Sequence, residues 1–418
     1  MFTCNINKEL NYDVAVIGGG TAGVFAAISA ARAGAKTILI EKNNILGGTM
    51  TMANVCFPGL FFAWGKRIIG GPCWEAIERT VELGGATIPE VPFKPLHHWD
   101  VQINLNRYIF TTVLFQMCDE AGVDVKCSSM VSYAKETDGG VDLVITCKDG
   151  LCSIKAGAAI DATGDANLCS ILGFDLLKSE KQQPATLSNR ITGYELTDEI
   201  IEEVRRAIPL SKFPDYIQPF HILHYLKIGK IDMHIPCHDA DTSEGKTALE
   251  KRALYDILHM YKFYRSVKGL ENLTVSFTAQ ETGVRETNRV SGETVISADD
   301  YINGVLYPDS VCYAFYPIDL HVMNGIEQKF HEENVVSKVP YSALIPKGTK
   351  RVFCAGRCIS SDTYANSALR VEAVCMATGQ VAGVAAAMCV KDKTQALQLD
   401  YSKLCNGLDT IGAIVPKA

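Results

Sequence analysis

Tyr12-Asp-Val-Ala-Val-Ile-Gly18-Gly-Gly20-Thr-Ala-Gly23 is the stretch that decides the fold. It predicts a strand, a glycine turn and a helix over 25–33, followed by a second strand over 37–41. The glycines suit a dinucleotide: Gly18 permits a tight turn, Gly20 lets the backbone approach a pyrophosphate, and Gly23 lets helix and strand pack. The helix start would direct free N–H groups at the phosphates. Glu41 lies where its carboxylate can accept both ribose hydroxyls. The alternative is a structural βαβ unit without a ligand.

Length and composition describe an ordinary globular protein. The chain has 418 residues, 47% of them hydrophobic, which predicts two domains or one large domain with a substantial insertion. A net charge of −7 gives no sign of a nucleic-acid partner. There is no lysine- or arginine-rich block, so a membrane-surface partner is not expected either.

Compartment signals favour the cytoplasm. The first ten residues lack a basic region followed by an apolar run, so no secretory signal is predicted. Fifteen cysteines without a framework indicate reduced thiols in a cytosolic protein. The apolar segment 371–390 contains Glu372, Gly379, Gln380 and Gly383, so we expect a buried, closely packed helix and not a membrane span.

The rest of the chain alternates between strand and helix patterns. We expect helices over 104–120, 246–267 and 365–390, and a hairpin of 141–147 with 151–154 around Asp149-Gly150. Strands are also expected over 123–127, 158–161, 272–278 and from 351. Between 178 and 270 proline, histidine and aromatic residues become more frequent. We therefore predict a nucleotide-binding domain in two parts, 1–180 and 336–418, with a substrate domain over 181–335.

Four pieces fit together if the dinucleotide is FAD. The glycine turn with Glu41 is the first, and Leu46-Gly47-Gly48-Thr49 is the second. Asp161-Ala-Thr163-Gly164-Asp165 and Cys354-Ala-Gly356-Arg357 with Asp362 each end a predicted strand near the cofactor. The helix after Asp362 would direct its N–H groups at the flavin and stabilise negative charge on the reduced ring. The expected cofactor contacts are Gly18, Gly20, Thr21, Ala22, Gly23, Glu41, Lys42, Gly47, Gly48, Thr49, Met50, Val131, Thr163, Gly164, Asp165, Gly356, Arg357, Asp362, Asn366 and Ser367.

Longer strings extend this pattern over most of the chain: Thr282-Gly-Val-Arg285-Glu-Thr-Asn-Arg289, Tyr316-Pro-Ile-Asp319-Leu-His321, Pro340-Tyr-Ser-Ala-Leu-Ile-Pro346 and Ala368-Leu-Arg370. With the four glycine-containing pieces, the chain resembles the bacterial FAD-dependent oxidoreductase family, within the superfamily of fumarate reductase flavoproteins and glutathione reductase. The resemblance implies bound FAD. It also implies an α/β fold, with a Rossmann-like FAD-binding domain of the glutathione reductase type and an inserted α+β substrate domain.

One departure from that superfamily concerns cysteines. Its disulfide reductases carry Cys-x4-Cys directly after the double glycine and threonine, where this chain has Met50 and Val55, with Cys56 alone. Cys147 and Cys152 have the spacing, but they flank the predicted hairpin and are interpreted as structural. There is no second GxGxxG, so a separate NAD(P)H domain is not expected.

Candidate catalytic residues come from the second domain. Arg285 and Arg289 would share a helix face, and arginine suits carboxylate or phosphate binding. The alternative is a structural network with Glu281, Glu286 or Glu293. His321, with Tyr316 nearby, is a candidate general base or a structural histidine. His97 and His98 are interpreted as a surface or domain-contact pair.

Metal binding is not predicted. Histidines and cysteines do gather in one part of the sequence, but their spacing matches no familiar closed site. Packing is the preferred interpretation for this group, which comprises His221, His224, His234, Cys237 and His238.

The predicted function is hydride transfer between flavin N5 and a small polar substrate, anionic or hydroxylated, with an external electron acceptor or donor. Alternatives are a C=C reductase of the fumarate reductase type, and a biosynthetic or modifying enzyme without net substrate redox. A further alternative is a non-catalytic FAD- or NAD-binding protein. Assembly into a homo-oligomer is compatible with each of them.

Overall fold

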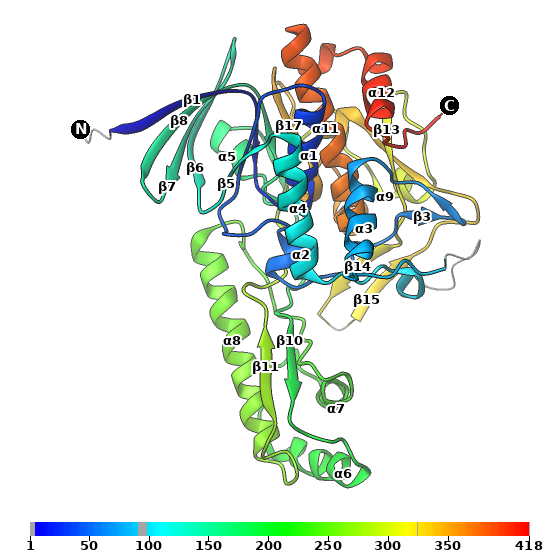
Figure 1. Ribbon diagram of the computed structural model, residues 1–418. Helices are drawn as coiled ribbons and strands as arrows, with labels where there is room; N and C mark the ends of the chain where they lie inside the picture. The colour runs from blue at the N-terminus through cyan, green and yellow to red at the C-terminus, as the bar shows by residue number, and fades with distance from the viewer. Residues whose placement is uncertain (1–4, 91–97, 324, 418) are drawn as a thin grey trace.

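A mixed seven-stranded sheet forms the centre of the molecule in the computed structural model, which describes residues 5–90, 98–323 and 325–417 (Figure 1). The strand order is β5-β2-β1-β8-β7-β6, and β17 also pairs with β8. The strands are β1 (Ile6–Ile17), β2 (Thr37–Ile40), β5 (Asp124–Lys126), β6 (Met130–Thr137), β7 (Gly140–Cys147), β8 (Gly150–Asp161) and β17 (Val352–Cys354).

The parallel part of the sheet fixes the location of the site. β5, β2, β1, β8 and β17 run parallel, so their carboxyl ends share one edge. This edge is where ligands bind in open α/β sheets. β6, β7 and the first half of β8 form an antiparallel meander, which confirms the predicted hairpin.

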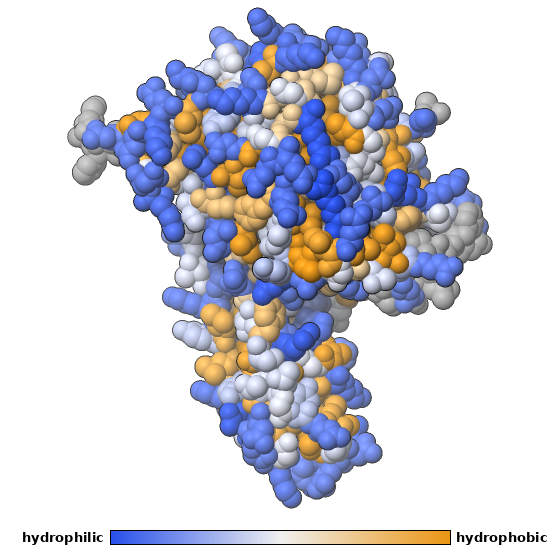
Figure 2. All heavy atoms as spheres, in the orientation of Figure 1, coloured by the Kyte–Doolittle hydropathy of each residue, from blue (hydrophilic) through white to orange (hydrophobic). Residues whose placement is uncertain are grey.

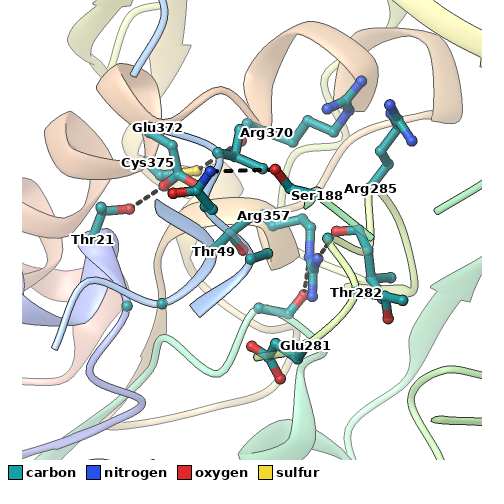
Figure 3. Close-up of a pocket in the computed structure, with 18 of the residues that line it drawn as sticks. Thr21, Thr49, Ser188, Glu281, Thr282, Arg285, Arg357, Arg370, Glu372 and Cys375 are labelled. Atoms are coloured by element: carbon teal, nitrogen blue, oxygen red, sulfur yellow. Dashed lines mark hydrogen bonds between the residues drawn. The ribbon is translucent and has the colours of Figure 1, made fainter. Parts of the chain in front are cut away.

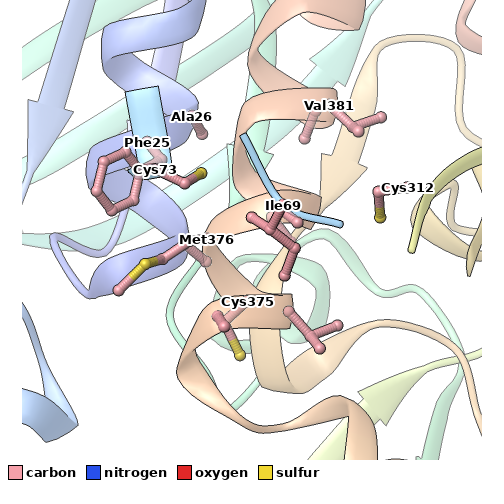
Figure 4. Packing of buried hydrophobic residues seen from close by; sticks show 14 of the residues in the cluster. Phe25, Ala26, Ile69, Cys73, Cys312, Cys375, Met376 and Val381 are labelled. Carbon is pink, nitrogen blue, oxygen red and sulfur yellow. The ribbon is translucent and has the colours of Figure 1, made fainter. Parts of the chain in front are cut away.

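The long helices α1 (Thr21–Arg32) and α11 (Glu372–Asp392) pack on one face of the parallel strands, and residues of the β6–β8 meander and of α5 (Asn167–Leu172) pack on the other face. The two long helices pack closely against one another. A Cβ atom on Gly379 would lie 2.1 Å from the Ala22 carbonyl oxygen, and one on Gly383 would lie 2.1 Å from that of Ala26. Only glycine permits this approach. Figure 4 shows Phe25, Ala26, Met376 and Val381 in the core beside these helices.

α11 is long and apolar enough to span a membrane. Its most apolar 18-residue segment has a mean hydropathy of 1.7, but 89% of that segment is buried inside the protein. The expectation of a buried core helix is confirmed. The other helices of this body are α2 (Thr49–Met52), α3 (Pro72–Glu82), α4 (Arg107–Ala121), α5 (Asn167–Leu172), α9 (Ala298–Ile302), α10 (Thr363–Leu369) and α12 (Tyr401–Thr410), with short 3-10 turns at His98–Val101, Tyr341–Leu344, Gly356–Cys358 and Ala396–Gln398.

A second body projects from the first as an arm (Figures 1 and 2). Its own hydrophobic cluster draws on residues 185–279. The long helix α8 starts at Ser243, because the Thr242 hydroxyl caps it by accepting from Gly245 N at 3.0 Å. The arm contains α6 (Asp198–Ala207), the 3-10 turn Ile208–Leu210, α7 (Pro219–Ile228), α8 (Ser243–Arg265), β10 (Asn189–Thr192) and β11 (Thr274–Thr278).

The hydrophobic clusters divide the chain differently from the predicted domains. Residues 296–345 were assigned mostly to the substrate domain, yet their buried side chains belong to the same cluster as α1 and α11. The arm lies within the predicted substrate domain, 181–335, whose bounds stay a prediction. The remaining strands are β3 (Phe62–Ala63), β4 (Lys66–Arg67), β9 (Leu176–Lys178), β12 (Asn288–Val290), β13 (Ser310–Ala314), β14 (Ile318–Val322), β15 (Gly325–Lys329) and β16 (Ser337–Pro340).

The prediction of one continuous terminal helix over 365–390 is wrong. The structure has two helices, because α10 ends at Leu369 and α11 begins at Glu372. Val371 between them is extended, with φ −65° and ψ 144°. This break places Arg370 and Glu372 beside the site described next.

Candidate functional site

A cavity of about 1630 Å³ lies between the carboxyl edge of the parallel strands and the arm (Figure 3). Single-ligand pockets measure roughly 300–1,000 Å³, so this cavity has room for a cofactor and a substrate. It brings together fourteen expected cofactor contacts: Gly18, Gly20, Thr21, Ala22, Glu41, Lys42, Gly48, Thr49, Val131, Thr163, Gly164, Asp165, Gly356 and Arg357.

The glycine turn has the geometry expected of a dinucleotide site. Gly18 adopts φ +102°, and a Cβ atom there would lie 2.4 Å from the Ala162 carbonyl oxygen. A Cβ on Gly20, in contrast, would meet only Gly48 Cα, at 3.9 Å. Packing therefore does not require glycine at position 20, whereas a ligand close to the backbone does. α1 begins there without a side-chain cap, so its first N–H groups are available to phosphate.

Glu41 is buried at the end of β2 and fixes the turn. Its Oε2 accepts from Gly19 N at 2.5 Å, and its Oε1 accepts from Asn43 N at 2.7 Å. Burial raises the pKa of this carboxyl, against the lowering effect of those two hydrogen bonds. The acid expected at the ribose therefore also holds the turn in place.

The ends of β8 and β17 are joined by hydrogen bonds between the residues that follow these two strands. Arg357 Nη2 lies 2.5 Å from Asp165 Oδ1, and Arg357 Nε donates to the Gly164 carbonyl oxygen at 2.8 Å. Thr287 donates to the same Asp165 oxygen at 2.6 Å. The third and fourth glycine-containing pieces are thus one connected wall of the site.

Six expected contacts do not line the cavity: Gly23, Gly47, Met50, Asp362, Asn366 and Ser367. Gly23 packs against the turn, as predicted, because its Cβ would lie 1.7 Å from the Gly18 carbonyl oxygen.

Asp362, Asn366 and Ser367 remain predicted cofactor contacts, and each also makes hydrogen bonds within the protein. Asp362 caps α10 through Ala365 N at 2.7 Å and also accepts from Ala298 N, so both carboxylate oxygens are used. Asn366 donates to the Arg357 carbonyl oxygen, and Ser367 donates to that of Tyr364. The helix start that borders the cavity is accordingly that of α11 and not that of α10.

Glu372, the first residue of α11, lines the cavity although the sequence pattern does not single it out. Its Oε2 accepts from the Thr21 hydroxyl (Figure 3). Burial raises the pKa of this acid to about 7, although Thr21, Arg357 and Arg370 act in the opposite direction. An acid at the start of an otherwise apolar helix was the available signal.

Two arginines line the cavity near β14. Figure 3 shows the guanidinium groups of Arg285 and Arg370 extending into the same region. Arg285 Nη1 donates to the Pro184 carbonyl oxygen at 2.6 Å. Burial and then the nearby Arg370 lower the pKa of Arg285 to about 10, so it stays cationic at neutral pH. Arg370 Nε is buried without a hydrogen-bond partner among the described residues.

His321 lies beside this pair, on β14. Its Nε2 lies 3.1 Å from Asp319 Oδ2, and its Nδ1 lies 3.2 Å from Nε2 of His234. Burial lowers the pKa of His321 to about 4, and although Asp319 raises it, Arg285 and Arg370 add to the lowering. Burial raises the pKa of Asp319, but hydrogen bonds from His321 and Gln328 bring it to about 2. At neutral pH we therefore take Asp319 as ionised and His321 as neutral.

Tyr316 also lines the cavity, and His98 packs against its ring at a centroid distance of 4.8 Å. The interpretation of His98 as a surface or domain-contact residue stays a prediction, and His97 lies outside the described residues. Arg289 follows the structural alternative, because it is buried in an ion pair with Glu286 at 2.9 Å. Arg285 and Arg289 therefore have different roles.

Neither a disulfide nor a metal cluster is present in the described part of the chain. Cys147 and Cys152 are free thiols whose sulfurs lie 3.8 Å apart on the β7–β8 hairpin. Cys56 lines the cavity without a second thiol hydrogen bonded to it, and its Sγ donates to the Met50 carbonyl oxygen. Of the histidine and cysteine group over 221–238, only His234 lines the cavity.

The family model described as "FAD dependent oxidoreductase" matches residues 13–408. The chain belongs to this family. It is a flavoprotein enzyme with a Rossmann-like FAD-binding fold, and its cofactor is FAD. The open turn at Gly20, the uncapped start of α1 and the buried Glu41 fit that cofactor.

Curated relatives match parts of this oxidoreductase. The thiamine thiazole synthase of Aeropyrum pernix is 47% identical over 168 residues, which are 39% of this chain and 58% of that protein. The digeranylgeranylglycerophospholipid reductase of Picrophilus torridus is 37% identical over 91 residues, 22% of this chain and 16% of that protein. The oxidoreductase thus covers less than two thirds of either relative.

Solved structures resemble the oxidoreductase over most of its length. A geranylgeranyl bacteriochlorophyll reductase-like protein from Thermoplasma acidophilum has a TM-score of 0.41 and 15% identity, covering 96% of this chain and 92% of that one. The anhydrotetracycline hydroxylase OxyS from Streptomyces rimosus has a TM-score of 0.46 and 11% identity, covering 96% and 65%.

Proposed function

We propose that this oxidoreductase exchanges hydride between flavin N5 and a small polar substrate that carries a negative charge. The observation that carries the proposal is the arginine pair, because Arg285 and Arg370 share one cavity with the dinucleotide turn. When bound, FAD supplies the hydride acceptor or donor. A separate small molecule would serve as the external electron partner.

The two arginines would bind and orient the substrate. Two acids, Asp319 and Asp232, lie near the two arginines, and Asp319 Oδ2 lies 4.0 Å from Arg370 Nη2. No described residue hydrogen bonds Arg285 Nε or Nη2, so these donors are available to a carboxylate. A guanidinium fork suits carboxylate or phosphate in two-point contact.

His321 would move the proton that accompanies hydride transfer. A neutral imidazole can accept a proton near neutral pH, and Asp319 holds its Nε2 side in place. Because Nδ1 faces His234 Nε2, the proton would be shared between the two rings, and a pair that is already protonated would serve as the acid for the reverse direction. Tyr316, which lines the same cavity, would supply a hydrogen bond to substrate.

We also infer the glutathione reductase type of FAD-binding fold. The order of the sheet supports this inference, since the glycine turn after β1 is followed by the β6–β7–β8 meander and the late return strand β17.

A second candidate is biosynthesis without net substrate redox. The observation that favours it is the 47% identity to the thiamine thiazole synthase of Aeropyrum pernix over 168 residues. A C=C reductase of the fumarate reductase type is also compatible with these arginines. An unsaturated acid carries the same carboxylate and would accept hydride from the reduced flavin.

Anaerobic mixing of the purified holoprotein with a panel of small hydroxy, amino and unsaturated acids tests the proposal. Bleaching of the visible flavin band by one or more hydroxy or amino acids is expected. Reoxidation of the photoreduced protein by an unsaturated acid alone would favour the C=C reductase. If neither these acids nor their neutral amides change the redox state of the flavin, the hydride-transfer proposal is wrong.

A further inference from the structure

Four groups form a row of polar contacts between β14 and the arm. Asp319 Oδ2 lies 3.1 Å from His321 Nε2, and His321 Nδ1 lies 3.2 Å from His234 Nε2. At the far end, His234 Nδ1 lies 3.1 Å from the Val322 carbonyl oxygen. The row therefore has three contacts and two imidazole rings.

Counting protons shows that the row is incomplete at neutral charge. The Asp319 carboxylate and the Val322 carbonyl only accept hydrogen bonds, so His321 Nε2 and His234 Nδ1 must both be protonated. A neutral imidazole has one N–H, which leaves His321 Nδ1 and His234 Nε2 as two facing lone pairs. One additional proton would turn that contact into a hydrogen bond.

The surroundings explain why the additional proton is absent without a ligand. Both rings are largely buried, and burial lowers the pKa of His234 as well as that of His321. The neighbouring cations act in the same direction. The charged and titratable groups that face the pair are Asp319 on β14, Arg370 after α10, Arg285 before β12, Asp232 beside His234, and His221 on α7.

We propose that binding of a small carboxylate or other oxyanion at Arg285 and Arg370 draws one proton from solvent into the His321–His234 contact. The anion would offset the two guanidinium charges that oppose a third positive charge. The added proton would then complete all three hydrogen bonds of the row. This inference rests on the proposed function for the negative charge of the ligand, but not on hydride transfer.

His234 is a positioning residue in this scheme, since it acts on the site through His321. It belongs to the arm segment that pairs with Ala185, whereas His321 belongs to β14 of the main body. The completed hydrogen bond would tie the arm to the main body only when an anion is bound. Substrate binding and arm position are thereby coupled to one proton.

Calorimetric titration of the oxidised holoprotein with oxalate tests the proposal. Near pH 6, in two buffers of different ionisation enthalpy, we expect uptake of about one proton per oxalate bound, and affinity that rises up to about tenfold for each unit of falling pH. Oxalate that binds without proton uptake would overturn the proposal. So would the absence of oxalate binding at millimolar concentration.

The variant His234→Asn separates the pair from the arginines. Its amide can still donate to the Val322 carbonyl oxygen but has no group in place of Nε2, so proton uptake should vanish while oxalate binding at pH 8 changes less than about threefold. The exposed His224→Asn is the matched control and should behave as wild type. If His234→Asn retains full proton uptake, the pair is not the acceptor.

Imidazole nitrogen NMR of the wild-type holoprotein gives a readout that needs no variant. One ring of the pair should become an imidazolium when oxalate is added near pH 6. Two rings that stay neutral would contradict the proposal. Since no turnover is measured, a failed substrate screen would leave this result unaffected.

Discussion

Glu372 accepts a hydrogen bond from the Thr21 hydroxyl, and this contact joins the starts of α11 and α1 across 351 positions of sequence. The two helix starts therefore meet at the cavity, with the dinucleotide turn on one side and Arg370 on the other. A buried acid at this point responds to charge from both directions.

Glu372→Gln should remove a pH-dependent cost to stability. Since the pKa of Glu372 is raised from 4.5 to about 7, its contribution to stability is present below pH 4.5 and is lost as pH rises through 7. The shift corresponds to about 3 kcal/mol. We expect the variant to match wild type near pH 4 and to unfold at higher denaturant concentration near pH 8. Equal midpoints at both pH values, with exposed Glu195→Gln as control, would contradict this role.

Glu41→Ala should weaken FAD binding by about 1.5–3 kcal/mol, because charge-assisted hydrogen bonds to the ribose are lost. The loss of the Gly19 and Asn43 contacts should loosen the turn as well. Fluorescence titration of the apoprotein with FAD measures the effect. Affinity unchanged from that of the Glu195→Ala control would exclude Glu41 from the cofactor site.

His321→Ala should retain FAD and lose roughly 10²–10⁴-fold in the rate of flavin reduction by substrate, as expected for a positioned acid or base.

Arg285→Ala should chiefly raise KM, since Arg285 binds substrate charge without moving a proton. Stopped-flow reduction under anaerobic conditions distinguishes the two. A structure of a substrate complex with both side chains beyond hydrogen-bond reach would refute these assignments.

Cys56→Ser should leave reduction by substrate largely intact. Burial raises the pKa of the Cys56 thiol, although Arg107 lowers it, so the reactive thiolate is disfavoured at neutral pH. Met50 and Val55 occupy the positions of the disulfide-reductase cysteines. A loss beyond about 100-fold, with FAD bound and the fold intact, would restore a cysteine mechanism.

The residues of the dinucleotide turn can be predicted from the sequence because short-range geometry determines their positions. Gly18, Gly20 and Glu41 lie within one βαβ unit, where chain spacing fixes their relative positions. Asp165 and Arg357 were also expected there, because they follow strands that end at the same edge of the sheet.

The part of the cavity around Arg285, Arg370 and His321 is harder to predict because it depends on tertiary contacts. Asp362 is an acid that follows a predicted strand, as a cofactor ligand would be, and it also caps α10. The break between α10 and α11 is not visible in the apolar pattern. His234 reaches His321 only because the arm segment that contains His234 contacts β14. Arginine pairs such as Arg285 and Arg370 are likewise assembled from distant segments.

Binding of FAD in this cavity can be tested by denaturing the purified protein. The native protein should be yellow, and unmodified FAD should appear in the supernatant once the protein is precipitated. Colour that remained with the precipitate would contradict non-covalent binding. A colourless native protein that could not be reconstituted with FAD would contradict FAD binding itself.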